Sequence, residues 1–199
     1  MRVKVCYGNS GWDFDRVCHV RQSVAGESEF NFDRYSHHYL FENQGEPVGV
    51  MTVHRAEDGD LDCQSYYPEA LVQQFRTSLV SVCKLRFLRD SRCPSSCLRS
   101  LIRAAWRHQL PRGIRFAILN TETSLAPFYR RIGFRRLDGF DFVHPQLGTD
   151  SQVMLMAADP DVRSFCNDLF RQIADPVCLE QGCAAARAET IEDFSLTAA

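Results

Sequence analysis

The sequence has no long apolar run and no leader-like start. No apolar stretch approaches the roughly 20 residues that a membrane-spanning helix requires. Residues 1–7 alternate between polar and apolar types as a strand does, and they lack the apolar centre of a signal peptide. There is also no internal repeat, which argues against a solenoid or an array. We therefore expect a cytoplasmic protein without a membrane span.

The nine cysteines lack the spacing of a zinc site. Two close pairs exist, Cys93 with Cys97 and Cys178 with Cys183, but the gaps are three and four residues instead of two. The two pairs are also separated by 80 residues. Without an export signal the cysteines are expected to be reduced and to act as small buried side chains. The sequence predicts no structural metal.

Size and composition indicate one globular domain with an appendage. The chain has 199 residues, of which 45% are apolar and 24% charged. A chain of this length buries roughly 70% of its unfolded surface, so neither disulfides nor a metal is needed for folding. We expect a domain over residues 1–158, followed by a C-terminal helix and tail over residues 159–199.

A net charge of −2 conceals an uneven charge distribution. Residues 84–136 contain 13 basic and only two acidic residues, while the rest of the chain is acidic. Such a basic segment can meet an anionic partner, although solvated arginines on helix faces would explain part of it. Nucleic acid is a poor candidate for this partner, because no helix-turn-helix, aromatic stacking set or zinc knuckle accompanies the arginines.

The apolar pattern predicts alternating strands and helices. Alternation with a period of two predicts strands at residues 2–7, 38–41, 47–54, 79–88, 115–119 and 152–156. Helical spacing predicts helices at residues 14–24, 71–75, 98–110, 124–132 and 162–173. In the strand at 79–88, alternation would place on one face Val80, Val82, Lys84, Arg86 and Leu88. This order predicts a mixed α/β sheet flanked by helices.

Two segments carry residues suited to chemistry. The first is residues 92–97, which lead into the helix at 98–110, where free N–H groups and arginines would suit a phosphate. An ordinary helix cap by Ser95 or Ser96 explains this segment equally well. The second is the helix that carries Tyr129 among arginines, where a phenol can exchange a proton more readily than usual. A tyrosine packed in the core would give the same pattern.

These segments resemble a known superfamily. The sequence APFYRRIGFRRL resembles the last motif of the GNAT N-acyltransferases, in which a helix carries Tyr-x-x-x-Gly-Phe. PVGVMTV resembles the third strand of that fold, and RCPSSC occupies the place of its pyrophosphate-binding loop. YYPEAL, SVCKLRFL and VHPQLGTDSQVMLM are similar to segments of the N-acyl amino acid synthases and, more distantly, of the acyl-homoserine lactone synthases. The resemblance covers residues 1–158.

The resemblance implies a fold and a site. The sheet would be mostly antiparallel with a V-shaped split between the strands at 79–88 and 115–120, and a pantetheine arm would lie in the split. Tyr129 would protonate the leaving thiolate, and Glu122 or Ser81 would complete the catalytic set. A backbone N–H near Phe87 would polarise the thioester carbonyl. The expected donor-binding residues are Phe87, Leu88, Arg89, Arg92, Cys93, Ser95, Ser96, Cys97, Leu98 and Asn120.

The general base is not obvious from the sequence. Ser81 stands where related enzymes have a glutamate, so Glu122, His54, His144 or a chain of waters could replace that glutamate. Direct attack by the amine needs no covalent intermediate. Cys83 and Cys97 are poor candidates for a nucleophile, because no His or Asp stands at a suitable spacing.

The expected reaction moves a long acyl chain from acyl carrier protein to the amine of an amino acid, an amino-acid derivative or a peptide. Arg99, Arg103 and Arg107 share one helix face and would attract the acidic carrier protein. No cofactor would be tightly bound, since the acyl-phosphopantetheine or acyl-coenzyme A is a substrate. The alternatives are an N-acetyltransferase that uses coenzyme A thioesters, and a GNAT-fold binding protein without catalysis.

Overall fold

The computed structural model describes residues 2–88 and 94–157, apart from the side chains of residues 94–96 and 99. Helices form where apolar residues recur at helical spacing: α1 Trp12–Ala25, α2 Glu69–Gln74, α3 Pro94–Gln109 and α4 Ala126–Arg131. Three short 3-10 turns are η1 Asp33–Tyr35, η2 Gln64–Tyr66 and η3 Leu110–Arg112. The strands are β1 Arg2–Tyr7, β2 Ser36–Asn43, β3 Glu46–Arg55, β4 Leu79–Phe87, β5 Phe116–Glu122, β6 Arg135–Arg136, β7 Phe142–Val143 and β8 Asp150–Ala157.

The strands form one sheet in the order β1-β2-β3-β4-β5-β8-β6, with β7 paired to β8. Every pair among the described strands is antiparallel except β4 with β5. A parallel pair needs a crossover connection, and α3 provides it. The prediction of a mixed, mostly antiparallel sheet is confirmed.

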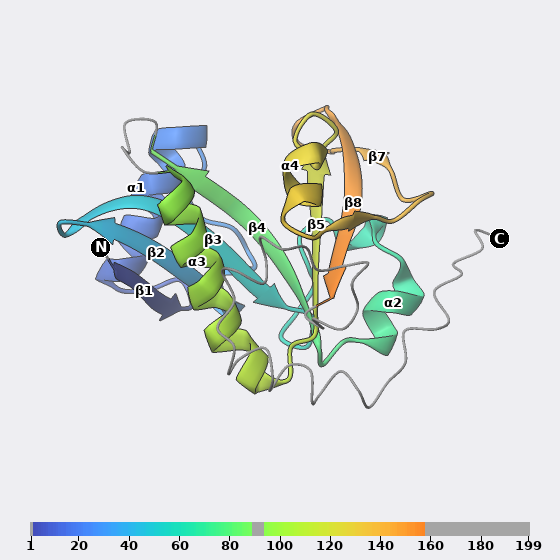
Figure 1. Ribbon diagram of the computed structural model, residues 1–199, viewed down its shortest axis with the longest axis horizontal. Coiled ribbons are helices and arrows are strands. Elements are labelled where there is room, and N and C mark those ends of the chain that lie inside the picture. The colour runs from blue at the N-terminus through green and yellow to red at the C-terminus, as the bar shows by residue number, and fades with distance from the viewer. Residues whose placement is uncertain (1, 89–93, 158–199) are drawn as a thin grey trace.

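Helices cover both faces of the sheet, as Figure 1 shows. On one face α3 and α4 pack over the core that contains Leu101, Trp106 and Phe134. On the other face α1 packs on β2 and β3, and α2 packs on β5 and β8. Because consecutive strand residues point to opposite faces, Leu40 contacts the α1 side while its neighbour Tyr39 contacts the α3 side.

The sheet divides between β4 and β5. These strands pair only at residues 79–81 and 116–118, although β4 continues to Phe87 and β5 to Glu122. Beyond that point β4 follows β3 and β5 follows β8, so the two strands diverge (Figure 1). The predicted V-shaped split is confirmed, and it leaves strand backbone open to a ligand.

A bulge in β4 corrects one prediction about side-chain direction. Thr52 pairs with Cys83 and Val50 with Arg86, so β4 has one more residue than β3 between these pairs. Lys84 takes a left-handed conformation there, with φ of 50°. The extra residue reverses the alternation. The expected common face for Val80, Val82, Lys84, Arg86 and Leu88 was therefore wrong: the residues that face α3 are Val80, Val82, Leu85 and Phe87.

Several expectations concern residues that the structure does not describe. The predicted helix at 162–173 and the tail after it lie outside the described residues, as do Cys93 and the three cysteines near the C-terminus. The described cysteines are free thiols: Cys6, Cys18, Cys63, Cys83 and Cys97. Within residues 2–88 and 94–157 we find no metal-binding cluster of His, Cys, Asp or Glu. No described helix is long and apolar enough to cross a membrane.

Gly49 allows β3, β4 and α3 to approach each other. A Cβ at this position would lie 2.6 Å from Cδ1 of Phe87 and 2.8 Å from Sγ of Cys97. We expect Gly49→Ala to lower the free energy of unfolding by about 1–3 kcal/mol, since both neighbours would have to move. Urea denaturation measures the change. Gly59→Ala is the control, because its Cβ would meet neighbours at 3.6 Å, and equal stability of both variants would contradict the prediction.

Candidate active site

A polar pocket lies at the open end of the split. It encloses about 790 Å³ of space that protein atoms do not fill, part of it open to solvent. β4 lines it with Cys83, Lys84 and Arg86, and β5 lines it with Asn120 and Glu122. Further lining residues come from α4 and from the segments before β2, η2 and β8, among them Glu27, Asp62, Tyr129, His144 and Leu147.

Two cations in this polar pocket are held by two carboxylates. Nη2 of Arg86 donates to both carboxylate oxygens of Glu27, at 3.0 and 2.9 Å. Lys84 Nζ lies 3.8 Å from Glu27 and 3.6 Å from Asp62. It also lies 4.0 Å from the centre of the Phe30 ring. The bulge at Lys84 turns both cations toward this pocket, which the regular alternation of a strand could not predict.

Tyr129 stands between the polar pocket and a second, apolar pocket. The side chain lines both, and its ring packs at right angles to Phe128 and Phe134. Burial raises the pKa of Tyr129, and the nearby Arg86 offsets only part of that increase. The phenol is therefore protonated at neutral pH and can give up its proton to a developing anion.

Two of the candidate bases are poorly suited to that role. His54 is buried with its Nδ1 3.1 Å from Ser36 Oγ, and it does not line the polar pocket. His144 does line it, but its Nδ1 accepts the N–H groups of Gln146 and Leu147 at 3.2 and 3.3 Å. A neutral ring with Nδ1 as acceptor carries its proton on Nε2, which lies 3.6 Å from Cys63 Sγ. Burial also lowers the pKa of His144.

Glu122 is the remaining candidate among the side chains, and it lines the polar pocket with Tyr129. Its contact in the described residues is a weak hydrogen bond from Ser124 Oγ at 3.4 Å. Neither Lys84 nor Arg86, the two cations that line this pocket, is paired with Glu122 in the described structure. A carboxylate of this kind can accept a proton from an amine.

Ser81 lies away from the polar pocket. It is buried where β4 and β5 separate, close to the hydroxyl of Tyr67. Asn120 Nδ2 donates to the same hydroxyl at 3.1 Å. Tyr67 thus lies at the closed end of the split, hydrogen bonded to β5 and close to β4. No pattern of residue types singles out Tyr67, which lies in the YYPEAL segment that is similar to the N-acyl amino acid synthases.

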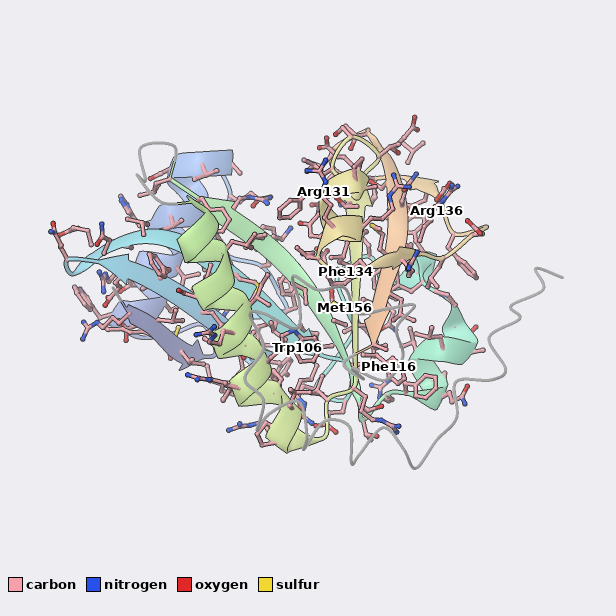
Figure 2. All side chains as sticks on the ribbon, in the orientation of Figure 1. Trp106, Phe116, Arg131, Phe134, Arg136 and Met156 are labelled. Carbon is pink, nitrogen blue, oxygen red and sulfur yellow. The ribbon has the colours of Figure 1, made fainter. Side chains whose placement is uncertain are left out.

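The apolar pocket lies over the split, between the sheet and the helices α3 and α4. It encloses about 590 Å³ of space that protein atoms do not fill, part of it open to solvent. Figure 2 labels three of its lining side chains, Trp106, Phe134 and Met156, which lie between α3 and the strands β5 and β8. Other lining residues include Val80, Val82, Leu85, Leu98, Ile102, Ala105 and Gln109. Such a pocket suits a hydrocarbon chain.

The backbone near Phe87 faces the split. Arg86 is paired with Val50 on β3, and the Leu88 N–H donates to Val48 O at 3.0 Å. Because peptide groups along a strand alternate in direction, the N–H of Phe87 between them points away from β3. It is therefore directed to the side on which β5 has separated.

Among the other predicted donor-binding residues, Asn120 lines the polar pocket and Leu98 lines the apolar one. Leu88 instead packs on the α1 side. Arg89, Arg92 and Cys93 lie outside the described residues, as do the side chains of Ser95 and Ser96. Burial raises the pKa of the Cys97 thiol to about 12, and Cys83 is affected in the same way. Neither thiol is poised to act as a nucleophile.

Comparison with known proteins relates this architecture to acyltransferases. Residues 6–159 match the family described as N-acyl amino acid synthase FeeM. No curated protein matches the chain. The structure of FeeM, an N-acyl amino acid synthase from uncultured soil microbes, superposes with a TM-score of 0.68 at 13% identity, covering 84% of this chain and 100% of FeeM.

Two further structures share the fold at low identity. The AHL synthase LasI superposes with a TM-score of 0.59 at 14% identity, covering 78% of this chain and 88% of LasI. An acyl-CoA N-acyltransferase from Pseudomonas aeruginosa gives a TM-score of 0.56 at 11% identity, covering 78% and 99%. The family match covers more than three quarters of the chain and includes β4, β5 and α4. The chain belongs to the N-acyl amino acid synthase FeeM family and is an N-acyltransferase with the GNAT fold.

Proposed function

We propose that this enzyme transfers a long acyl chain from the phosphopantetheine of acyl carrier protein to the amine of an amino acid. One observation carries the proposal: Tyr129 lies where the apolar pocket meets the polar pocket. A thioester whose hydrocarbon chain occupies the apolar pocket would have its carbonyl beside this residue. The acceptor would occupy the polar pocket on the other side.

The proposed reaction is a direct displacement. Glu122 takes a proton from the acceptor ammonium, and the neutral amine attacks the thioester carbon. The Phe87 N–H, directed into the split, would stabilise the oxyanion that forms. The C–N bond forms, the C–S bond breaks, and Tyr129 protonates the departing thiolate. Ser81 has no part in these steps, because it is buried and lines neither pocket.

An amino acid fits the charges of the polar pocket. A free amino acid brings one carboxylate and one ammonium. Arg86 Nη2, now paired with both oxygens of Glu27, would pair with the acceptor carboxylate in the same way. Glu122 offers the acidic group for the ammonium. Arg86 on β4 and Glu122 on β5 line the same pocket, so the proposed zwitterion would lie between the two strands.

The test of this function uses mixed substrates and mass spectrometry. The enzyme is incubated with acyl carrier protein loaded with acyl chains of several lengths and with an amino acid mixture. We expect N-acyl amino acids with long chains as products, and coenzyme A thioesters of the same chains as poorer donors. Equal or better turnover of acetyl-coenzyme A would overturn the proposal and indicate an ordinary acetyltransferase.

The carrier protein is proposed to dock on the arginines of α3. Arg103 and Arg107 are exposed and lie one turn apart, roughly 6 Å along the axis. Arg99 continues the series, although its side chain lies outside the described residues. Acyl carrier proteins are acidic, so this face would steer their approach.

Reversing these charges should affect one class of donor only. We expect the triple variant Arg99→Glu, Arg103→Glu, Arg107→Glu to lower kcat/KM for acyl carrier protein at least tenfold at low salt. Turnover of a small acyl-pantetheine thioester should stay unchanged, because that donor has no acidic surface. Arg34→Glu, an exposed change away from α3, controls for net charge. Equal losses on both donors would contradict the proposed docking surface.

A further inference from the structure

One polar side chain lines the apolar pocket at the end farthest from Tyr129. Gln109, the last residue of α3, is 2% exposed and lines this pocket together with Trp106. Val80 and Ala117 line the same region, and these two residues are partners in the short parallel pairing where the split closes. Gln109 therefore lies at the closed end, and Tyr129 and Leu85 lie toward the open end.

The hydrogen bonds of Gln109 leave one of its atoms without a partner. Its Nε2 donates to the Tyr39 hydroxyl at 2.9 Å, and that hydroxyl lies 2.9 Å from Nδ1 of His108. The Oε1 atom is buried and has no hydrogen-bond partner among the described residues. A buried carbonyl oxygen without a donor is costly, and it is normally satisfied by water or by a ligand. Most of the surrounding side chains are hydrocarbon and cannot supply a donor.

The position of Gln109 along α3 limits which part of a bound acyl chain could carry a hydrogen-bond donor to Oε1. Leu98 and Gln109 both line the pocket and are separated by 11 residues of α3, which corresponds to about 16 Å along the helix. An acyl chain that enters beside Tyr129 and follows α3 would meet Gln109 only with its distal carbons. A substituent close to the thioester would remain far from Oε1.

We propose that the preferred acyl donors carry a hydroxyl group near the distal end of the chain, and that this hydroxyl donates to Gln109 Oε1. This inference rests on the proposed function, in which the apolar pocket holds the acyl chain. The hydroxyl would satisfy the orphaned oxygen, while the rest of the chain contacts the apolar lining. Gln109 would then be the residue that determines specificity for the chain terminus.

The kinetic test compares matched donors. Decanoyl, dodecanoyl and tetradecanoyl thioesters are each supplied with and without a terminal hydroxyl, on the same carrier and with the same acceptor. For the chain length that reaches Gln109, we expect the hydroxylated donor to have a kcat/KM about tenfold higher than the plain donor. Equal or lower kcat/KM for every hydroxylated donor would overturn the inference.

Two variants assign the effect to one atom. Gln109→Met keeps a side chain of similar length but removes Oε1, so the preference for hydroxylated chains should disappear. Tyr39→Phe removes the hydrogen bond to Gln109 Nε2 and leaves Oε1 in place, so the preference should survive. If Gln109→Met retained the full preference, the hydroxyl would bind elsewhere and the inference would fail.

A binding measurement separates this inference from the proposed function. The chain has two tryptophans, of which Trp106 lines the apolar pocket and Trp12 is 69% exposed on α1. In a Trp12→Phe background, the fluorescence of Trp106 reports binding of free fatty acids. Tighter binding of the hydroxylated acids supports the inference. Equal binding of both kinds overturns it and leaves the acyl pocket intact, whereas no binding of either kind contradicts the acyl pocket as well.

Discussion

Replacing Tyr129 by phenylalanine is expected to lower kcat by about 10²–10⁴-fold, the usual contribution of a general acid. The ring contacts with Phe128 and Phe134 do not involve the hydroxyl, and the Phe134 N–H donates to the backbone oxygen of Tyr129. The variant should therefore fold with unchanged stability, as thermal unfolding would confirm. A rate within twofold of the parent would mean that Tyr129 has a structural role.

The pH dependence of the rate tests the general-acid role of Tyr129 independently. Burial raises the pKa of Tyr129 above its ordinary value of about 10. An acid is active in its protonated form, so its contribution should persist through neutral pH and fall only at more alkaline pH than for an ordinary tyrosine. The Tyr129→Phe variant should lack this alkaline limb. Tyr66→Phe is the control, because Tyr66 stacks on Phe142 and does not line either pocket.

Replacing Glu122 by glutamine is expected to lower kcat by a similar factor of about 10²–10⁴ near neutral pH. Glutamine has the same shape and can still accept the weak hydrogen bond from Ser124, but it cannot take up a proton from the acceptor ammonium. Initial rates at saturating acyl carrier protein measure the effect. Glu46→Gln, an exposed change on β3 outside the pockets, is the control.

The Glu122 defect should shrink as the pH rises. Once solvent has deprotonated the acceptor amine, a base in the enzyme has little left to remove. The ratio of parent to Glu122→Gln rates is therefore expected to fall steadily with increasing pH. A ratio that stays constant over the whole range would show that Glu122 binds or orients the acceptor and does not act as the base.

Much of the fold is determined locally, and the sequence alone predicted it. Strand alternation and helical spacing are properties of short segments, so the six longer strands, β1 to β5 and β8, and the four described helices could be predicted from the chain. The end of α4 is also encoded locally, because Gly133 of the Tyr129–Gly133–Phe134 motif takes a positive φ of 111° there. The family resemblance was also visible in the sequence, and it was this resemblance that implied the split between β4 and β5.

The content of the site depended on tertiary structure. The bulge at Lys84 changes which face each later residue of β4 occupies, and it arises from the register with β3, which no local pattern encodes. The choice among His54, His144 and Glu122 required the hydrogen bonds that occupy each group, and these come from residues distant in sequence or from a folded turn.

The two pockets and their boundary were likewise decided only by packing. The apolar pocket is formed where α3, α4 and the separated strands leave space between them, so residues as distant as Met51 and Met156 line it together. Tyr67 reaches the closed end of the split from a segment before α2, and Gln109 reaches it from the end of α3. A sequence specifies which side chains are apolar or polar, but which of them share a cavity depends on long-range contacts between elements.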